Sequence, residues 1–351
     1  MTSISILQEP ISSTSVANGP SLREAFKLVE QKTETPTDGQ SPLLLDGWLE
    51  FNRIVHGLEP RRFSSGFDTQ GATLDAVLYL DDRGRVRHPW RNPYLPVDFR
   101  PTPTGYAHRI ERQWHDAVAP LVSEMRQRGV VNTLNLPPSV QDVRPWLWAG
   151  YRVGLRYSYL VDFPFDRALT SKAVRSRIRS AERKGYRVER TTDFDQVYEC
   201  LRSTEVRQGY RLGVNRADIE LAHRLLGDKH LLAFAAFAPN GEMASVTINI
   251  HVRGSHSIGW VGGSRAEYMK DGAADLLELD SWDQMERLGA TGIDLCGANL
   301  PTIAAYKASL GARLVPYYTI EPYSSRRFLA WARKWWHFHR RRGEVIKHAA
   351  H

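Results

Sequence analysis

The sequence contains few cysteines and no long apolar run, and these two absences exclude several classes of protein. Cys200 and Cys296 are the only cysteines among its 351 residues, too few for a disulfide framework, a four-cysteine zinc site or an iron–sulfur cluster. No apolar stretch approaches the length of a membrane span. Residues 1–21 lack the basic start and apolar core of a signal peptide. We therefore expect a cytoplasmic protein.

Metal hydrolase chemistry and global disorder find no support either. The twelve histidines include no His-x-x-x-His pair with a carboxylate between, so the zinc-hydrolase motif is lacking and we expect no metal. Hydrophobic residues make up 42% and charged residues 25% of the chain, which is ordinary for a folded protein. The length suffices for two ordinary domains or one large one.

Positive charge is in small excess and is unevenly distributed. The formal net charge is +8. Residues 167–190 contain nine basic and two acidic residues, and residues 326–351 contain eight and one, so each window carries +7 and the remaining chain −6. Two basic segments on a mildly acidic body suggest a polyanionic partner, such as nucleic acid, an anionic membrane surface or a phosphorylated substrate. The alternative for each segment is a solvated helix face.

The hydrophobic pattern predicts two related α/β modules in tandem. Residues 1–40, rich in Ser, Thr, Pro, Gly and Gln, are predicted to be a disordered arm with one possible helix at 22–32. Helix, antiparallel strands, helix and strand then follow in residues 41–165 and again in 166–322. Residues 323–351 are predicted to form a basic, aromatic helix. The fold class is therefore α/β with mixed sheets.

Several single elements are well marked by their periodicity. The apolar stripe of residues 106–128 predicts one amphipathic helix, which Gly129 ends. Apolar, β-branched runs bounded by turn residues predict strands. The clearest of these runs are 72–80, 155–163, 231–238, 243–252 and 256–261, and helices are predicted at 273–288 and 302–310.

Four passages keep the order and spacing of one family's motifs. They are the strand 158–163 with the Arg-rich helix 174–185, the strand 259–264, the segment 289–297 (GATGIDLCG) and the segment 305–311 (AYKASLG). In these passages the chain resembles the Fem family of nonribosomal peptidyl transferases, which carry two modules of the GNAT acyltransferase fold. The resemblance covers residues 48–320. It implies two tandem GNAT-like modules, the second catalytic, and an N-acyltransferase that forms an amide.

The resemblance implies catalytic residues in the last of these passages. Lys307 matches the lysine at the family's acyl-transfer site, where an ammonium stabilises the oxyanion or anchors a donor phosphate. Tyr306 precedes it and offers a hydroxyl. The stretch from Trp260 through Gly262 and Gly263 to Ser264 is our candidate for the backbone N–H groups that face the donor carbonyl, with Ser264 grouped among the catalytic residues. Each has an alternative without a catalytic role. Lys307 would be an ordinary exposed lysine on a helix, Tyr306 a packed aromatic residue, and residues 260–264 a buried strand with a glycine bulge.

The acceptor site is implied less directly. Arg207, Tyr210 and Arg211 lie where Fem proteins grip their substrate, and Asn299 is a further substrate-binding candidate. Where those proteins have a tyrosine at the start of the long helix, residues 273–275 read Ala-Ala-Asp, so we expect the amine of a small metabolite or peptide as acceptor. No residue declares itself as general base. Candidates by residue type alone are Asp294, His251, His256 and Glu278.

The donor is either aminoacyl-tRNA, as in Fem proteins, or acyl-coenzyme A. The coenzyme A loop "Gln/Arg-x-x-Gly-x-Gly/Ala" is half met in residues 269–274: Gly272 fits, but Met269 replaces the first residue and Asp271 places negative charge at an anion site. A tRNA donor needs phosphate-binding Lys and Arg residues. The donor-binding candidates are Lys172, Arg175, Arg179, Arg183, Lys270, Gly272, Arg333, Lys334, Trp335, Arg340 and Arg341.

Three functions follow in order of preference. The first is transfer of an aminoacyl group from aminoacyl-tRNA to an amine, without a resident cofactor. The second is acyl transfer from acyl-coenzyme A on the same fold. The third is a non-catalytic GNAT-like protein that binds RNA or acts as a scaffold, and a side chain that plugs the strand gap at 260–264 would favour it. The C-terminal aromatic stripe either stacks on RNA bases, docks on the body or contacts a membrane surface.

Overall fold

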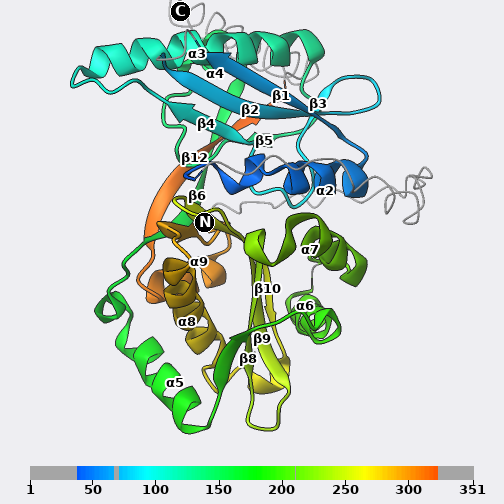
Figure 1. Cartoon of the computed structure of the whole chain (residues 1–351), viewed down its shortest axis with the longest axis vertical. Coiled ribbons are helices and arrows are strands. Elements are labelled where there is room, and N and C mark those ends of the chain that lie inside the picture. The colour runs from blue at the N-terminus through cyan, green and yellow to red at the C-terminus, as the bar shows by residue number, and fades with distance from the viewer. Residues whose placement is uncertain (1–37, 67–70, 210, 323–351) are drawn as a thin grey trace, which may run out of the picture.

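The computed structural model describes residues 38–66, 71–209 and 211–322. Nearly all of the predicted disordered arm and the whole predicted C-terminal helix lie outside these residues. Within them the molecule consists of two parts stacked along its long axis, each built on its own sheet (Figure 1).

The upper part is an antiparallel sheet covered by one long helix. The central strand β2 (Thr73–Leu80) pairs with β1 (Glu59–Gly66), β3 (Val86–Arg87) and β4 (Val97–Arg100). The helix α3 (Ala107–Arg128) confirms the prediction for 106–128, and its apolar stripe is buried against this sheet. Below the sheet lie η1 (Pro42–Leu44) and α2 (Asp46–His56), and α4 (Arg144–Trp148) packs on α3.

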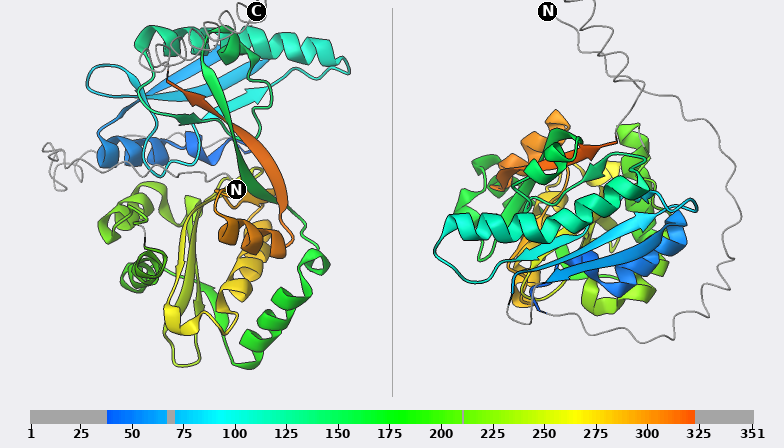
Figure 2. Two further views of the ribbon diagram at one scale, coloured as in Figure 1. Left: turned by 180° about the vertical axis from the view of Figure 1, so that it is seen from behind. Right: turned by 90° about the horizontal axis from the view of Figure 1, so that it is seen from above.

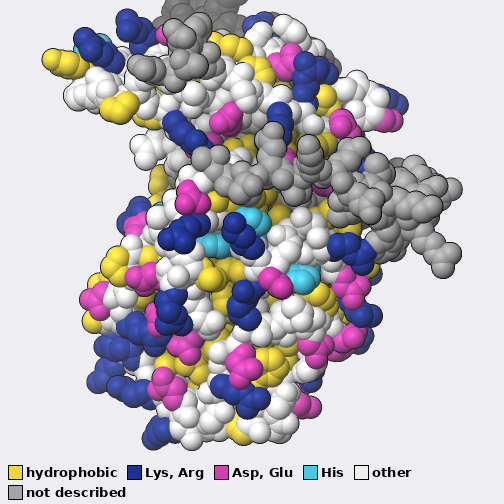
Figure 3. Space-filling view, viewed as in Figure 1, with side chains coloured by type: hydrophobic (Ala, Val, Ile, Leu, Met, Phe, Trp, Pro, Cys, Tyr) yellow, Lys and Arg dark blue, Asp and Glu magenta, His cyan; other side chains and the backbone are white. Residues whose placement is uncertain are grey.

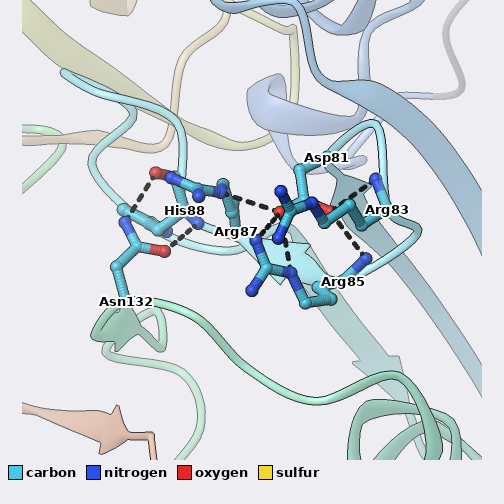
Figure 4. Close-up of polar contacts among 6 residues, drawn as sticks. All are labelled: Asp81, Arg83, Arg85, Arg87, His88 and Asn132. Carbon is cyan, nitrogen blue, oxygen red and sulfur yellow. Dashed lines mark hydrogen bonds and ion pairs between the residues drawn. The ribbon is translucent and has the colours of Figure 1, made fainter. Parts of the chain in front are cut away.

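A tight turn around Asp81 joins β2 to β3 (Figure 4). The buried carboxylate accepts hydrogen bonds from two backbone N–H groups of the turn and from the guanidinium groups of Arg85 and Arg87. Burial alone would raise the pKa of Asp81, but these hydrogen bonds together hold it well below its usual range. Beyond the turn, the side-chain amide of Asn132 bonds both backbone groups of His88, at 2.8 and 3.0 Å. These bonds fix the start of the loop that follows.

The lower part is an eight-stranded mixed sheet. Its order is β5-β12-β6-β11-β10-β9-β8-β7, and β10 and β11 are its parallel pair. The helices α5 and α8 cover one face, and α6 and α7 cover the other. The elements, in chain order, are β5 (Leu134–Asn135), β6 (Arg152–Asp162), η2 (Arg167–Leu169), α5 (Lys172–Arg183), β7 (Arg187–Arg190), α6 (Phe194–Gln208), α7 (Arg216–His230), β8 (Leu231–Phe237), β9 (Met243–Ile250), β10 (His256–Ser264), η3 (Ala266–Tyr268), α8 (Ala273–Arg287), β11 (Gly292–Asp294), α9 (Pro301–Ser309) and β12 (Arg313–Glu321).

Two long strands connect the parts. β6 and β12 pair along nine residues and run from the lower sheet up to the core of the upper part (Figure 2), where Ile320 is fully buried. The predicted class, α/β with mixed sheets, is confirmed. The module boundary at residues 165 and 166 stays a prediction; β6 precedes it in the chain but pairs with β11 and β12, which follow it.

Candidate functional site

The two parallel strands of the lower sheet part from each other. β10 and β11 pair over three residues, and the last pair is Ile258 with Asp294. Beyond it, β10 continues to Ser264 held by β9 alone, with a bulge between Gly259 and Val261. The β11-facing edge of residues 259–264 therefore has no strand partner, and a wedge opens between the strands.

A cavity of about 1200 Å³ occupies this wedge. It extends from loops of the upper part, through the wedge, to α8 and α9. Gly259, Gly262 and Gly263 line it and contribute no side chain. The ring of Trp260 packs edge-on against Trp48 and Phe51, with centroid distances of 5.4 and 5.3 Å. Among the described residues, no side chain fills the gap beside residues 260–264. A filled gap would have favoured a non-catalytic protein.

The upper wall of the cavity is the loop 88–94. The indole Nε1 of Trp48 donates to Oδ1 of Asn92 at 2.8 Å, and Nδ2 of Asn92 donates to the carbonyl of Tyr94 at 2.7 Å. Nε2 of His88 lies 2.7 Å from the Asn92 carbonyl. Burial lowers the pKa of His88 to about 4, so it is neutral near pH 7. These hydrogen bonds hold the loop together and tie it to α2, and no sequence motif pointed to it.

Lys307 lies in the cavity wall beside the wedge. Its ammonium donates to the carbonyls of Leu295 (2.7 Å), Cys296 and Gly297 (2.8 Å). All three of its hydrogens are therefore engaged, and its charge reaches the wedge through space. Burial lowers the pKa of Lys307. The lysine holds a left-handed turn, since Cys296 and Gly297 have φ values of 48° and 64°.

Asp294 holds the same turn from the other end. Its Oδ1 accepts from the Ser158 hydroxyl at 2.5 Å and from the Cys296 N–H at 2.8 Å. Burial raises the pKa of Asp294. The side chain does not line the cavity. His251 bonds Ser257, and His256 bonds Asp162 at 2.9 Å; neither lines the cavity.

Seven predicted site residues line the cavity, although their roles stay predictions. Arg207 donates to the Ser264 carbonyl at 2.9 Å, and the Ser264 hydroxyl lies 2.7 Å from that of Ser245. The Tyr306 hydroxyl is buried without a hydrogen-bond partner among the described residues, and burial raises its pKa. The seven are Arg207, Trp260, Gly262, Gly263, Ser264, Tyr306 and Lys307.

The other predicted residues lie elsewhere. Oδ1 of Asn299 accepts from the Tyr157 N–H at 3.2 Å, and the Arg211 carbonyl accepts from Arg91 at 2.7 Å. Lys270 is exposed outside the cavity. Tyr210, Arg333, Lys334, Trp335, Arg340 and Arg341 lie outside the described residues.

The helix α5 covers the N-terminal end of α8, where a coenzyme A pyrophosphate was the alternative expectation. A Cβ on Gly272 would lie 2.4 Å from the Arg177 carbonyl oxygen, so the glycine is needed for the two helices to pack. The Arg177 guanidinium holds Asp275 with two bonds of 2.6 and 3.0 Å. Asp271 accepts from Lys184 and from Tyr186. α5 therefore packs along one side of this end of α8, while Ala274 and Asp275 on the first turn of α8 also line the cavity.

The outer face of α5 is basic. Arg175 donates to the carbonyls of Ala168 and Thr170. Lys172, Arg179 and Arg183 are exposed, and none forms an ion pair within the part of the chain that the structure describes. Lys and Arg side chains gather over α5 at the lower left of Figure 3.

Sequence reasoning gave little weight to two residues that line the cavity. Among the four candidates for the general base, only Glu278 on α8 lines the cavity. Burial raises the pKa of Glu278 to about 7, although the nearby charge of Lys307 acts to lower it. Asn249 on β9 was missed. The signal was present: Ser245, Thr247 and Asn249 alternate with apolar residues in a strand that is buried throughout.

Comparison with known proteins adds the family context. Residues 169–308 match the family model of the GNAT acetyltransferase domain. The crystal structure of FemX is similar with a TM-score of 0.58 at 12% identity, covering 84% of this chain and 94% of that chain. The chain has a Fem-like GNAT fold. The two-module architecture of the resemblance is thereby confirmed.

Two further solved structures are similar to the chain with lower TM-scores. One is the C-terminal domain of a putative lysylphosphatidylglycerol synthetase from Agrobacterium fabrum, at 14% identity, with 80% of this chain and 89% of that chain covered and a TM-score of 0.49. The other is L-PGS from Bacillus licheniformis, at 13% identity, with 90% of this chain and 97% of that chain covered and a TM-score of 0.49. None of the curated proteins matches the chain.

The described residues contain no group of three or more His, Cys, Asp and Glu side chains arranged to hold a metal ion. None of their helices has both the length and the apolar character needed to cross a membrane.

Proposed function

We propose that the chain is an N-acyltransferase that moves an aminoacyl group from aminoacyl-tRNA to the amine of a small metabolite or peptide. The observation that carries this proposal is the open wedge between β10 and β11 within one continuous cavity. An acyl group that enters the wedge lies beside the backbone of residues 259–264 of β10, which does not pair with β11. Fixed N–H donors at such a point stabilise the tetrahedral oxyanion.

The reaction needs no redox partner. The acceptor nitrogen attacks the ester carbonyl carbon, and the negative charge collects on the carbonyl oxygen. The bond from carbon to the ribose oxygen then breaks, and the proton lost by the amine is gained by that oxygen. Lys307 contributes a fixed positive charge in a buried wall, where electrostatic interactions are strong.

The surroundings of α8 favour aminoacyl-tRNA over acyl-coenzyme A as the acyl donor. In coenzyme A enzymes of this fold, the pyrophosphate binds a glycine loop at the start of this helix; here α5 packs on that glycine and Arg177 holds Asp275. The exposed basic face of α5 offers sites for tRNA phosphates instead. The Fem family, which the chain resembles, takes its acyl groups from aminoacyl-tRNA.

The acceptor enters from the upper part in this proposal. The cavity there is lined by the loop 88–94 and by Arg156 on β6 and Tyr317 on β12. It therefore reaches the wedge from the side opposite α8. The cytoplasmic location that a charged-tRNA donor requires stays a prediction.

The test is product formation from a pool of charged tRNA with labelled amino acids, offered with a panel of amine acceptors and followed by mass spectrometry. We expect labelled amides with the wild-type protein. Lys307→Ala should lower the rate about 100-fold, whereas the exposed Lys229→Ala on α7 should not change it. A wild-type rate for Lys307→Ala would remove the lysine from the mechanism.

Acetyl-coenzyme A is the second candidate donor, because residues 169–308 match an acetyltransferase family model. It is tested in parallel with the same acceptors. Acetylated products without any product from charged tRNA would replace the first proposal by this one.

A further inference from the structure

The strand β9 carries an unusual polar stripe inside the lower sheet. All eight of its residues are buried. Ser245, Thr247 and Asn249 share one face, and their partners on β8 are the apolar residues of the core under α8. All three line the cavity. The stripe therefore faces the space between the sheet and α8.

Asn249 is the extreme member of this stripe. Its exposed fraction is 0%, and neither Oδ1 nor Nδ2 has a hydrogen-bond partner anywhere in the described chain. A buried amide left unpaired lowers the stability of the folded protein. Such a group indicates a ligand that both donates and accepts hydrogen bonds.

The position of Asn249 defines which part of a ligand reaches it. Asn249 pairs with Gly259, the first residue of β10 beyond the last β10–β11 pair. It therefore lies at the narrow end of the wedge. A bulky carrier enters from the open end, so the group that arrives at Asn249 is the transferred acyl group.

Glu278 lines the same cavity from α8. The groups that act on its carboxyl are Lys307 on α9 and the Trp282 and Asp275 side chains on α8, and the Tyr306 hydroxyl on α9 lies close enough to feel its charge. Lys307 is engaged by three carbonyls and Arg177 by Asp275, and Glu278 itself forms no ion pair within residues 38–66, 71–209 and 211–322. Because burial raises the pKa of Glu278 to about 7, part of the population carries a carboxylate near pH 7, and a cationic ligand would stabilise that charged form.

We propose that Asn249 and Glu278 form a subsite for the α-amino group of the transferred acyl group. The ammonium donates to Oδ1 of Asn249 and to the Glu278 carboxylate, and Nδ2 of Asn249 donates to an oxygen of the same aminoacyl group. This inference rests on the proposed function and names the class of acyl group: α-aminoacyl. An acetyl group leaves Asn249 Oδ1 and Glu278 without a donor, so the subsite selects against it.

The experiment is isothermal titration calorimetry with two stable mimics of the acylated tRNA end. One is 3′-(alanylamino)-3′-deoxyadenosine, and the other is its lactoyl counterpart, in which a hydroxyl replaces the amino group. We expect the wild-type protein to bind the amino form about 10-fold more tightly, because an ammonium–carboxylate hydrogen bond is stronger than a neutral one. Asn249→Leu and Glu278→Gln should each reduce this preference to near unity. The control Phe234→Leu, on the same face of β8, should keep it.

The outcomes separate the subsite from the proposed function. If the wild-type protein binds both mimics equally, or if both variants keep the preference, the subsite is wrong and the tRNA-dependent function stands. Binding of neither mimic overturns the subsite together with the tRNA donor. A preference that is lost in both variants and kept in Phe234→Leu supports the subsite.

Discussion

β8 and β9 are neighbours in one sheet, and the same helix covers them, but their faces toward that helix differ. β8 presents Leu232, Phe234 and Ala236, which pack with α8 in an apolar core. Their register partners on β9 are Asn249, Thr247 and Ser245, which line the cavity. The apolar face contributes stability. The polar face carries an unpaired amide, which lowers stability in the absence of a ligand. Within one sheet, therefore, the face that packs a core is apolar, and the face that lines the cavity includes a polar group without a protein partner among the described residues.

The apolar side of the comparison is tested by Phe234→Ala. Phe234 is fully buried, so removing its ring should lower the free energy of unfolding by about 4 kcal/mol. Chemical denaturation followed by tryptophan fluorescence measures this loss. A change below about 1 kcal/mol would show that β8 does not anchor the core.

Asp81 provides a buried polar group whose partners are all internal. Asp81→Ala removes the acceptor of Arg85, Arg87 and two backbone N–H groups, and should lower the free energy of unfolding by about 2 kcal/mol. Because the folded-state pKa of Asp81 is depressed, its stabilisation is present above the unfolded pKa of about 4 and lost as the pH falls below it. The pH dependence of unfolding should therefore weaken in the variant. An unchanged acid profile would contradict this.

Asn249→Leu should change stability in the opposite direction. Replacing the unpaired amide by an apolar side chain of similar size should raise the free energy of unfolding by about 1 kcal/mol. The same denaturation experiment measures it. Destabilisation by a similar amount would mean that the amide is paired in the folded protein, which would break the contrast between β9 and β8.

The smallest effect is expected on α5, where Arg177 is bound to Asp275 and Arg179 is exposed. If the exposed face meets tRNA phosphates, Arg179→Glu should raise the KM for charged tRNA about 3-fold and flatten its salt dependence. Glu182→Gln, on the exposed surface of the same helix, is the control and should leave both unchanged. If the two variants have the same KM and salt dependence, the basic face of α5 is only a solvated surface and does not bind tRNA.

The sequence predicts most of the elements because their periodicity is strong. The stripe of α3 and the strands β2, β8, β9 and β10 are confirmed within a few residues. β1 was missed, since its sequence EPRRFSSG has no apolar alternation and its pairing with β2 alone makes it a strand. Tertiary contacts decided this element, not local propensity.

The candidate site was predictable only where a motif marked it. The order of the motifs placed Lys307 and the stretch 260–264, which line the cavity. Gly272 fitted an anion-binding loop by spacing, but its contact with the Arg177 carbonyl gives it a packing reason that spacing does not reveal. Asn249 required knowledge of which face of β9 lies over the wedge, and that depends on the register with β10.

The central claim, that the acyl donor occupies the wedge, is tested most directly by narrowing it. Ala274 lines the cavity from α8, and Ala107 is exposed on α3, far from it. Calorimetric binding of 3′-(alanylamino)-3′-deoxyadenosine is measured for Ala274→Phe and for the control Ala107→Phe. We expect Ala274→Phe to weaken binding about 100-fold, a loss of about 2.8 kcal/mol, while the control binds as the wild type does. Wild-type affinity in Ala274→Phe would show that the acyl donor does not occupy the wedge.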